Sequence, residues 1–232
     1  MKKVALCIHD LRVSDEIKII ETIKSVRESF KSDPVTVHLV IDEDVTSNNE
    51  TFIFLKKEIE AGRLEIVFHG VSHRCPEGTA KLFSWYHKYQ AEFLSNTFQV
   101  EVNKLRYNEL NNLFQIKAGI CPSCWIANRE GWNFIKSLEP LYFEKLLSIN
   151  YQDNCYFSIP ISMASNNKNE LFFLKILMSF ITTFVIIFNH QRLRFVIHTI
   201  DLTVEDSVTF FRQKYFRLIS TGFSPVLQKD LI

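Results

Sequence analysis

The sequence predicts one α/β domain built on a mostly parallel sheet, and three observations lead to that fold class. The chain has 232 residues, 47% of them apolar, which is enough for one sizeable core. Short apolar runs typical of buried strands alternate with segments whose apolar residues recur at helical spacing, as in βαβ units. Gly and Pro number only six each, so the connections should be short and without a linker.

The individual elements follow from these patterns. Residues 4–8 form the first buried apolar run, and Ser14 then caps a helical pattern that ends at Phe30. The residues Thr203-Val204-Glu205-Asp206 resemble a capping box that opens a last helix running to Gly222. Between these, strands are expected at 35–41, 64–68, 115–120, 146–150, 155–161 and 193–199, and helices at 50–61, 79–114 and 129–138.

The segment from Leu171 to Phe188 is the most apolar part of the chain. Its 18 residues include one charge, Lys175, and approach the length of a membrane span. Lys175, Ser179 and Thr182 form one narrow polar stripe, which is typical of a helix lying on a protein core. We therefore expect a buried element or a homo-oligomer interface. A membrane span or a membrane-surface contact is the alternative, as is a helix followed by a strand over 182–188.

Charge, cysteine content and the N-terminus narrow the classes of function. A net charge of +1 lacks the strong basic field of a non-specific nucleic-acid binder, so no nucleic-acid partner is expected. Five cysteines without a repeated spacing do not indicate a disulfide scaffold. The glycines stand singly, so no phosphate-binding loop is expected. The first apolar run is too short for a signal peptide, which predicts a cytoplasmic protein.

Polar residues that end the predicted strands are the candidate site residues, because sites in α/β sheets gather at the carboxyl ends of strands. Two imidazoles at i and i+4, together with a carboxylate, could hold a divalent cation and leave a position open for water. His38, His87 and His190 are expected to be structural or surface residues. The strand-end residues are His9-Asp10, the His69 and His73 pair, Cys121-Pro122-Ser123-Cys124-Trp125, and His198 with Asp201.

In order and spacing these motifs resemble those of the polysaccharide deacetylase superfamily, the NodB-like carbohydrate esterases, and in particular its short bacterial branch. Glu92-Phe93 also resembles a Glu-Phe pair of that branch. The resemblance spans most of the chain and implies a single domain over 1–232, folded as a distorted (β/α) barrel of about seven strands. Its four motifs here are Ile8-His9-Asp10, the stretch from Phe68 to Arg74, residues 119–126 and residues 196–202.

The resemblance also implies an activity, that of a metal-dependent hydrolase that removes an acetyl group from a sugar or glycan precursor by cleaving an amide or ester bond. Asp10, His69 and His73 would bind the divalent metal ion, most often zinc in the superfamily. His198 would protonate the leaving group, and Asp201 would orient neighbouring groups. The carbohydrate would contact Trp125, Arg74 and Pro122.

The sequence departs from the superfamily pattern in three places. The usual general base is an acidic residue directly before the metal-binding aspartate, and His9 stands there instead. A histidine can act as a base near neutral pH, so the expected mechanism is altered rather than excluded. Ser123 and Cys124 replace a common proline and an aromatic residue, which could reshape the loop near the developing oxyanion.

Two other functions stay open from the residues alone. A catalytically inactive, deacetylase-like protein that binds glycans is one, because of His9. A thiol–disulfide oxidoreductase is the other, because Cys121 and Cys124 form a CxxC between a predicted strand and helix. Taken singly, Asp10, His198 and Asp201 also fit plain capping or hydrogen-bonding roles.

Overall fold

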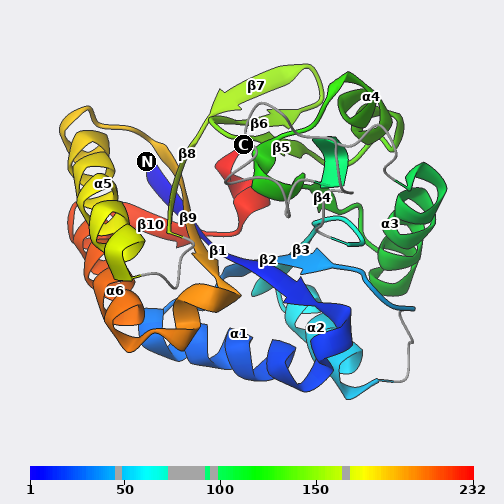
Figure 1. The fold of residues 1–232 in the computed structure, drawn as a ribbon, viewed down its shortest axis with the longest axis horizontal. Coiled ribbons are helices and arrows are strands. Elements are labelled where there is room, and N and C mark those ends of the chain that lie inside the picture. Colours follow the sequence, from blue (N-terminus) through cyan, green and yellow to red (C-terminus); the bar gives the residue numbers. More distant parts are fainter. Residues whose placement is uncertain (45–48, 73–91, 95–98, 164–167) are drawn as a thin grey trace.

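The computed structural model describes residues 1–44, 49–72, 92–94, 99–163 and 168–232. One sheet of ten strands dominates it and curls into a nearly closed barrel (Figure 1). The order along the sheet is β7-β6-β5-β4-β3-β2-β1-β9-β8, and β10 pairs with β1. The strands are β1 (Lys2–Arg12), β2 (Val35–Val40), β3 (Leu64–Phe68), β4 (Gly119–Ile120), β5 (Phe143–Lys145), β6 (Ser148–Tyr151), β7 (Asn154–Phe157), β8 (Ile159–Met163), β9 (Arg192–His198) and β10 (Phe223–Val226).

The seven neighbouring strands β5, β4, β3, β2, β1, β9 and β8 run parallel to one another. Beyond β5, the strands β6 and β7 extend the sheet in antiparallel orientation. The predicted α/β class and the mostly parallel sheet are therefore confirmed. The carboxyl ends of the parallel strands meet at one end of the barrel, which is where sites form in such sheets.

The described residues form six helices, which lie outside the sheet (Figure 1). Side chains alternate across a strand, so each strand has a face toward the helices and a face toward the barrel interior. Leu6 and Ile8 of β1 belong to the large core shared with the helices, whereas Ala5 and Cys7 belong to a second, smaller cluster. The helices are α1 (Glu16–Phe30), α2 (Glu50–Glu60), α3 (Val100–Phe114), α4 (Arg129–Ser137), α5 (Lys168–Ile187) and α6 (Glu205–Ser220).

Both predicted N-terminal caps are wrong. The Ser14 hydroxyl donates to Asp42 Oδ2 at 2.8 Å instead of capping α1, which begins at Glu16. Thr203 Oγ1 donates to the carbonyl oxygen of Ile200, and α6 begins without a side-chain cap. Ser14 thus bonds a carboxylate 28 residues away in the chain, and Thr203 bonds a carbonyl oxygen three residues back, so neither hydroxyl caps a helix.

Other boundaries also shift. The strand expected at 115–120 is reduced to two residues, and the run 155–161 is split between β7 and β8. Strands β5 and β10 lie outside the predicted set. The sequence predicts a long helical region over 79–114. The described residues of this range form a 3-10 turn at Glu92–Leu94 and the helix α3, and the rest lies outside the described residues.

Helix α5 runs without a break through the apolar segment, so a strand over 182–188 is wrong. Its polar stripe faces the protein: Thr182 is fully buried, and Lys175 and Thr183 contact α6. The large apolar residues on the other side are exposed, which contradicts the expected burial of this segment within the chain. Among the described residues, none of the helices has the length and apolar character that crossing a membrane requires.

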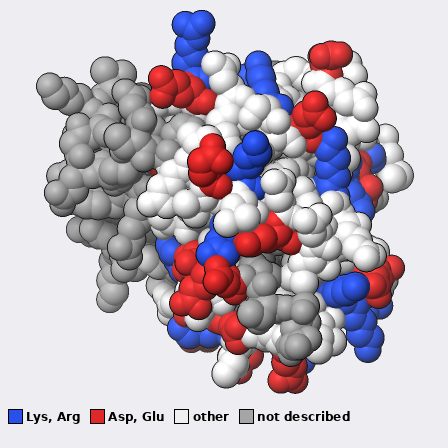
Figure 2. All heavy atoms as spheres, turned by 90° about the vertical axis from the view of Figure 1, so that its right-hand side faces the viewer, with Lys and Arg blue, Asp and Glu red and all other residues white. Residues whose placement is uncertain are grey.

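The face that carries α3 shows Lys and Arg intermingled with Asp and Glu over its described part (Figure 2). A surface with both signs of charge interspersed has no extended field of one sign. This face therefore offers no continuous basic tract.

Candidate metal centre

A bulge at the end of β1 places His9 and Asp10 at the mouth of the barrel. Ile8 pairs with Val37 of β2 and Leu11 pairs with Leu39, so two residues of β1 stand opposite His38 alone. Asp10 takes the left-handed conformation with φ 65°, which aspartate tolerates better than most residues. His9 points into the barrel, where it is almost fully buried.

Asp10 meets His69 at this mouth. Asp10 Oδ1 lies 3.3 Å from His69 Nε2, and His69 Nδ1 lies 2.7 Å from the carbonyl oxygen of Cys121. A carbonyl oxygen only accepts, so Nδ1 carries the proton and donates it. This hydrogen bond orients the ring so that Nε2 faces Asp10.

Four buried side chains, His69 among them, could hold a metal ion. His9, His38, His69 and Cys121 each offer a ligand atom, and these atoms lie within 4.8 Å of one another. Burial lowers the pKa of His38 to about 4 and that of His9 well below its usual value, so both imidazoles are neutral at pH 7. Within the described part of the chain, His9 Nε2 and His38 Nδ1 are buried without a hydrogen-bond partner.

Ring geometry limits which of these histidines can share an ion. Two imidazoles on one tetrahedral zinc ion have ring centres about 5 Å apart, given Zn–N bonds of about 2.0–2.1 Å. The ring centres of His9 and His69 are 5.0 Å apart, which fits. Those of His9 and His38 are 3.7 Å apart with the rings stacked, so one of these two rings must turn before both can bind the same ion.

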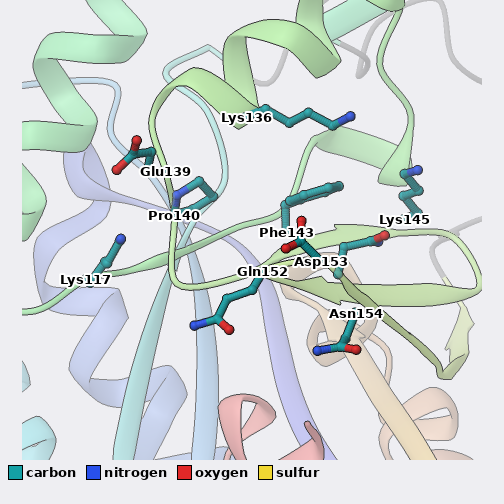
Figure 3. Close-up of a pocket in the computed structure, with 10 residues that line it drawn as sticks. Lys117, Lys136, Glu139, Pro140, Phe143, Lys145, Gln152, Asp153 and Asn154 are labelled. Carbon is teal, nitrogen blue, oxygen red and sulfur yellow. The ribbon is translucent and has the colours of Figure 1, made fainter.

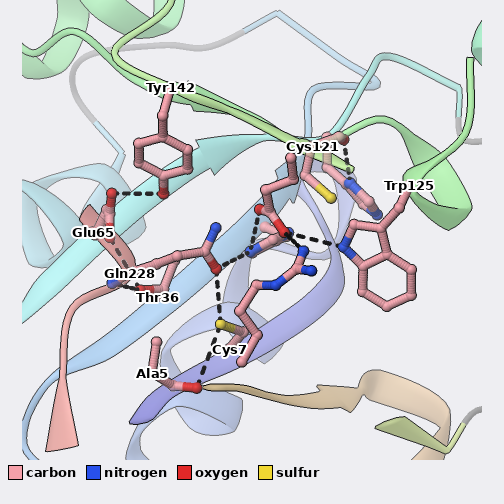
Figure 4. A network of polar contacts seen from close by, with 12 residues as sticks. Ala5, Cys7, Thr36, Glu65, Cys121, Trp125, Tyr142 and Gln228 are labelled. Carbon is pink, nitrogen blue, oxygen red and sulfur yellow. Dashed lines mark hydrogen bonds and ion pairs between the residues drawn. The ribbon is translucent and has the colours of Figure 1, made fainter. Parts of the chain in front are cut away.

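A buried ion pair lies beneath the histidines. Arg194 Nη1 contacts Glu144 Oε2 at 2.7 Å, and both side chains are fully buried. The other oxygen of Glu144 lies 3.4 Å from His38 Nε2, and Trp125 donates its indole N–H to Oε2 (Figure 4). Burial acts to raise the pKa of Glu144, but the charge and hydrogen bond of the paired Arg194 guanidinium oppose it, and the pKa is lowered. Glu144 is thus ionised, and its carboxylate contacts both Trp125 and His38.

His198 and Asp201 form a second pair at the same end of the barrel. His198 ends β9 in register with His9, and their ring centres are 5.3 Å apart. His198 Nδ1 lies 3.4 Å from Asp201 Oδ2 and from Ser162 Oγ, and the backbone N–H of His198 donates to the same carboxylate. Asp201 is fully buried, and its backbone N–H donates to the His198 side chain, which holds the orientation of that ring.

The loop after β4 places Trp125 beside His9, with ring centres 5.3 Å apart. Pro122 is buried, and its carbonyl oxygen accepts the N–H of Trp125 at 2.8 Å, so it shapes the turn that presents the indole. The structure thus brings together His9, Asp10, His69, Trp125, His198 and Asp201 from the predicted set; His73 and Arg74 lie outside the described residues.

Sequence reasoning missed the roles of His38, Glu144 and Arg194. His38 is fully buried and stacks on His9, so a surface role is wrong for it. The alternation of side chains between the two faces of a strand could have indicated the polar interior. Thr36 and His38 occupy the same face of β2, as Arg194 and His198 do on β9. Polar residues recurring on one face of several parallel strands indicate a polar barrel interior.

Glu92 supports the loop that follows His69. Its Oε2 accepts the backbone N–H groups of Val71 and Ser72, each at 3.1 Å, and Asn103 donates to Oε1. Gly70 has φ 90°, and a Cβ there would lie 2.5 Å from Glu92 Oε2. Only glycine therefore fits between His69 and this carboxylate.

The environment of Cys121 does not favour redox catalysis. Burial, reinforced by nearby Glu144, raises the pKa of the Cys121 thiol well above its usual value. Reactive cysteines of thiol–disulfide enzymes have a lowered pKa instead. The side chain of Cys124 is outside the described set.

Glu65 lies deeper in the barrel interior. Tyr142 donates to its Oε1 at 2.7 Å, and Thr36 and the backbone N–H of Lys229 donate to Oε2 (Figure 4). Burial raises the pKa of Glu65 from 4.5 to about 7, although these hydrogen bonds oppose the shift. Glu65 is therefore partly protonated near neutral pH.

We expect this carboxyl to make stability fall as the pH rises. Below about pH 4.5 Glu65 is protonated in both the folded and the unfolded chain; between 4.5 and 7 only the unfolded chain releases the proton. The free energy of unfolding should drop by about 3 kcal/mol over that window. Urea titrations at pH 5 and pH 8 measure it. Glu65→Gln should remove this component, whereas Glu139→Gln, at an exposed position, should keep it; an equal slope in both variants contradicts the assignment.

Two surface cavities differ in their relation to the site. One of about 450 Å³ is lined by Asp10, Leu11, Arg12 and residues of the turn after β9, so of the candidate site residues its lining contains Asp10 but not His69, His198 or Trp125. The other, of about 480 Å³, lies between α4 and the β5–β7 region and has three lysines in its wall, Lys117, Lys136 and Lys145 (Figure 3). Its lining contains none of the candidate site residues.

The fold and site together define an α/β barrel with a buried histidine and cysteine group, able to hold a metal ion, at the carboxyl ends of its strands. Compared with models of known protein families, with curated proteins and with solved structures, the chain matches none. The resemblance to polysaccharide deacetylases thus rests on the sequence motifs alone.

Proposed function

We propose that this protein is a metal-dependent hydrolase that removes an acetyl group from a sugar or glycan precursor, on a barrel of the NodB type. The observation that carries the proposal is the pair formed by Asp10 and His69. Their facing atoms are 3.3 Å apart, which is about the separation of two donors on one tetrahedral zinc ion with bonds of about 2.0–2.1 Å.

The surroundings of His69 also fit a metal ligand. Metal-binding histidines usually donate their other ring N–H to a carbonyl or a carboxylate, which fixes the tautomer. His69 does so to the carbonyl oxygen of Cys121, and its unprotonated Nε2 then faces a carboxylate oxygen. His73 is the third expected ligand by the motif.

The other residues have roles of their own in this proposal. A divalent ion bound here supplies an activated water and polarises the acyl carbonyl. His198, held at Nδ1 by Asp201, donates a proton from Nε2 to the departing amine or alcohol. His9 stands in the place of the usual general base and is neutral at pH 7, and the burial that lowers its pKa makes it a weak base there.

Space and surface beside the pair suit a sugar. The cavity next to Asp10 has about 450 Å³, within the usual range for small-molecule sites. Trp125 is fixed by Glu144 close to His9 and provides an aromatic surface of the kind that packs on sugar rings. These features favour a carbohydrate over a protein substrate.

Acetate release tests the proposal. Zinc-loaded protein should release acetate from some member of a panel of N-acetylated and O-acetylated sugars, and Asp10→Ala should abolish the release. If the protein binds the metal and retains a glycan but releases no acetate from any member, the inactive glycan-binding alternative replaces the hydrolase. If neither metal nor glycan binds, both are wrong.

A further inference from the structure

The outward face of α5 is an exposed apolar surface along a helix of 20 residues, about 30 Å long. Figure 1 shows α5 at the edge of the molecule, beside α6 and away from the remaining helices. A continuous apolar surface of this length is uncommon on a protein that works alone in water. Its exposed members are Phe172, Phe173, Ile176, Leu177, Phe180, Phe184, Ile187 and Phe188, here called the α5 face.

The orientation of α5 is fixed by its polar side. Thr182 is buried and donates to the carbonyl oxygen of Met178, and Arg217 of α6 donates to Thr183. Met178 and Val185 are also buried. Turning the apolar side inward would expose Thr182, Met178 and Val185 and would break the contact between Arg217 and Thr183.

The apolar surface continues past the helix onto the β6–β7 hairpin. The ring of His190 lies 5.7 Å from that of Phe184 and 5.5 Å from that of Phe157, which is half exposed. Ser158, the next residue, donates its backbone N–H to the carbonyl oxygen of Leu147. Leu146 and Leu147 are exposed at the turn between β5 and β6. Two separate elements therefore present one apolar surface.

Cations border the α5 face on its α6 side. Lys175 and Lys214 both lie over the ring of Phe210, and Arg217 is exposed beside Thr183. From Leu171 to Phe188 the sequence has no acidic residue. An apolar helix face bordered by cations matches the boundary between lipid headgroups and acyl chains, where the headgroups carry negative charge.

We propose that the α5 face docks the protein on the surface of an anionic lipid bilayer, with α5 lying in the interface rather than crossing it. A second copy of the chain fits less well. Two copies joined through this face by a twofold axis that crosses α5 would bring their cationic borders together, which opposes association. An anionic lipid surface instead complements the border. The inference does not depend on the hydrolase proposal.

Co-sedimentation with vesicles tests the docking. The full chain should bind vesicles of phosphatidylcholine and phosphatidylglycerol at least tenfold more tightly than vesicles of phosphatidylcholine alone, and high salt should weaken the binding. The double variant Phe173→Glu/Phe180→Glu, at positions 73% and 67% exposed, should lose binding by tenfold or more. The matched control is Ile17→Glu on α1, at a position 76% exposed, which should bind as the unmodified chain does.

A second variant covers the case in which two glutamates disturb folding. Phe180→Trp keeps the surface aromatic, and its fluorescence should be quenched by brominated lipid in anionic vesicles. No binding to anionic vesicles, or equal binding by the double variant and the control, overturns the proposal. A concentration-dependent dimer that the double variant abolishes, without vesicle binding, assigns the face to a second copy instead.

Discussion

Replacing Arg194 with Met should lower the free energy of unfolding by about 3–5 kcal/mol, because it leaves the Glu144 carboxylate buried without its partner. Arg194 also donates to the carbonyl oxygens of Lys145, Leu146 and Ser158, which joins β9 to the hairpin region. Chemical denaturation followed by circular dichroism measures the loss. Few single changes in this chain should cost more.

The double variant Arg194→Met/Glu144→Gln is the matched control for that experiment. It removes both charges, so no unpaired ion stays buried, and it should recover part of the lost stability. The Gln side chain can still accept the indole N–H of Trp125. If the double variant is less stable than Arg194→Met by the full cost of Glu144→Gln alone, the two residues are not coupled and the account of this pair is wrong.

Replacing His198 with Ala should lower kcat for acetate release by about 10²- to 10⁴-fold, as expected for the loss of a general acid. Asp201→Asn keeps the hydrogen bond to the His198 backbone possible but removes the charge that faces Nδ1, so we expect a smaller loss. Steady-state kinetics over a range of pH measure both. The substrate KM should change little.

His190→Ala is the control for these two variants, because His190 contacts the α5 end of the molecule and not the site. It should keep full activity. If His198→Ala changes KM alone, His198 binds substrate and is not the proton donor. If Asp201→Asn equals unmodified protein over the whole pH range, Asp201 does not orient the ring.

The sequence predicts the sheet well because strand burial leaves a local pattern. Runs such as 35–41 and 64–68 are apolar enough to be read directly, and β2 and β3 fall there. The ends of these runs locate His9, Asp10, His69 and His198, which the parallel order of the strands then brings to one end of the barrel. For such residues the position in the fold follows from the sequence, because a residue that ends a parallel strand lies at the same end of the barrel as the other strand ends.

Other features depend on partners far apart in the chain. Arg194 and Glu144 are 50 residues apart, and only closure of the barrel makes them a buried pair. The polar stripe of α5 packs on the protein, whereas the sequence predicts that the apolar side does so. Periodicity shows that a helix has two faces but not which of them meets the protein. The stacking of His38 on His9 likewise follows from a bulge in β1 that no local pattern announces.

Metal content of the purified protein tests the central claim most directly. Elemental analysis after loading with zinc should find about one ion per chain, lost in Asp10→Ala and His73→Ala and retained in Cys121→Ser and His190→Ala. Retention in Asp10→Ala with loss in Cys121→Ser would place the ion among the inner histidines and contradict the hydrolase site. No ion in the unmodified protein would contradict any metal centre at this end of the barrel.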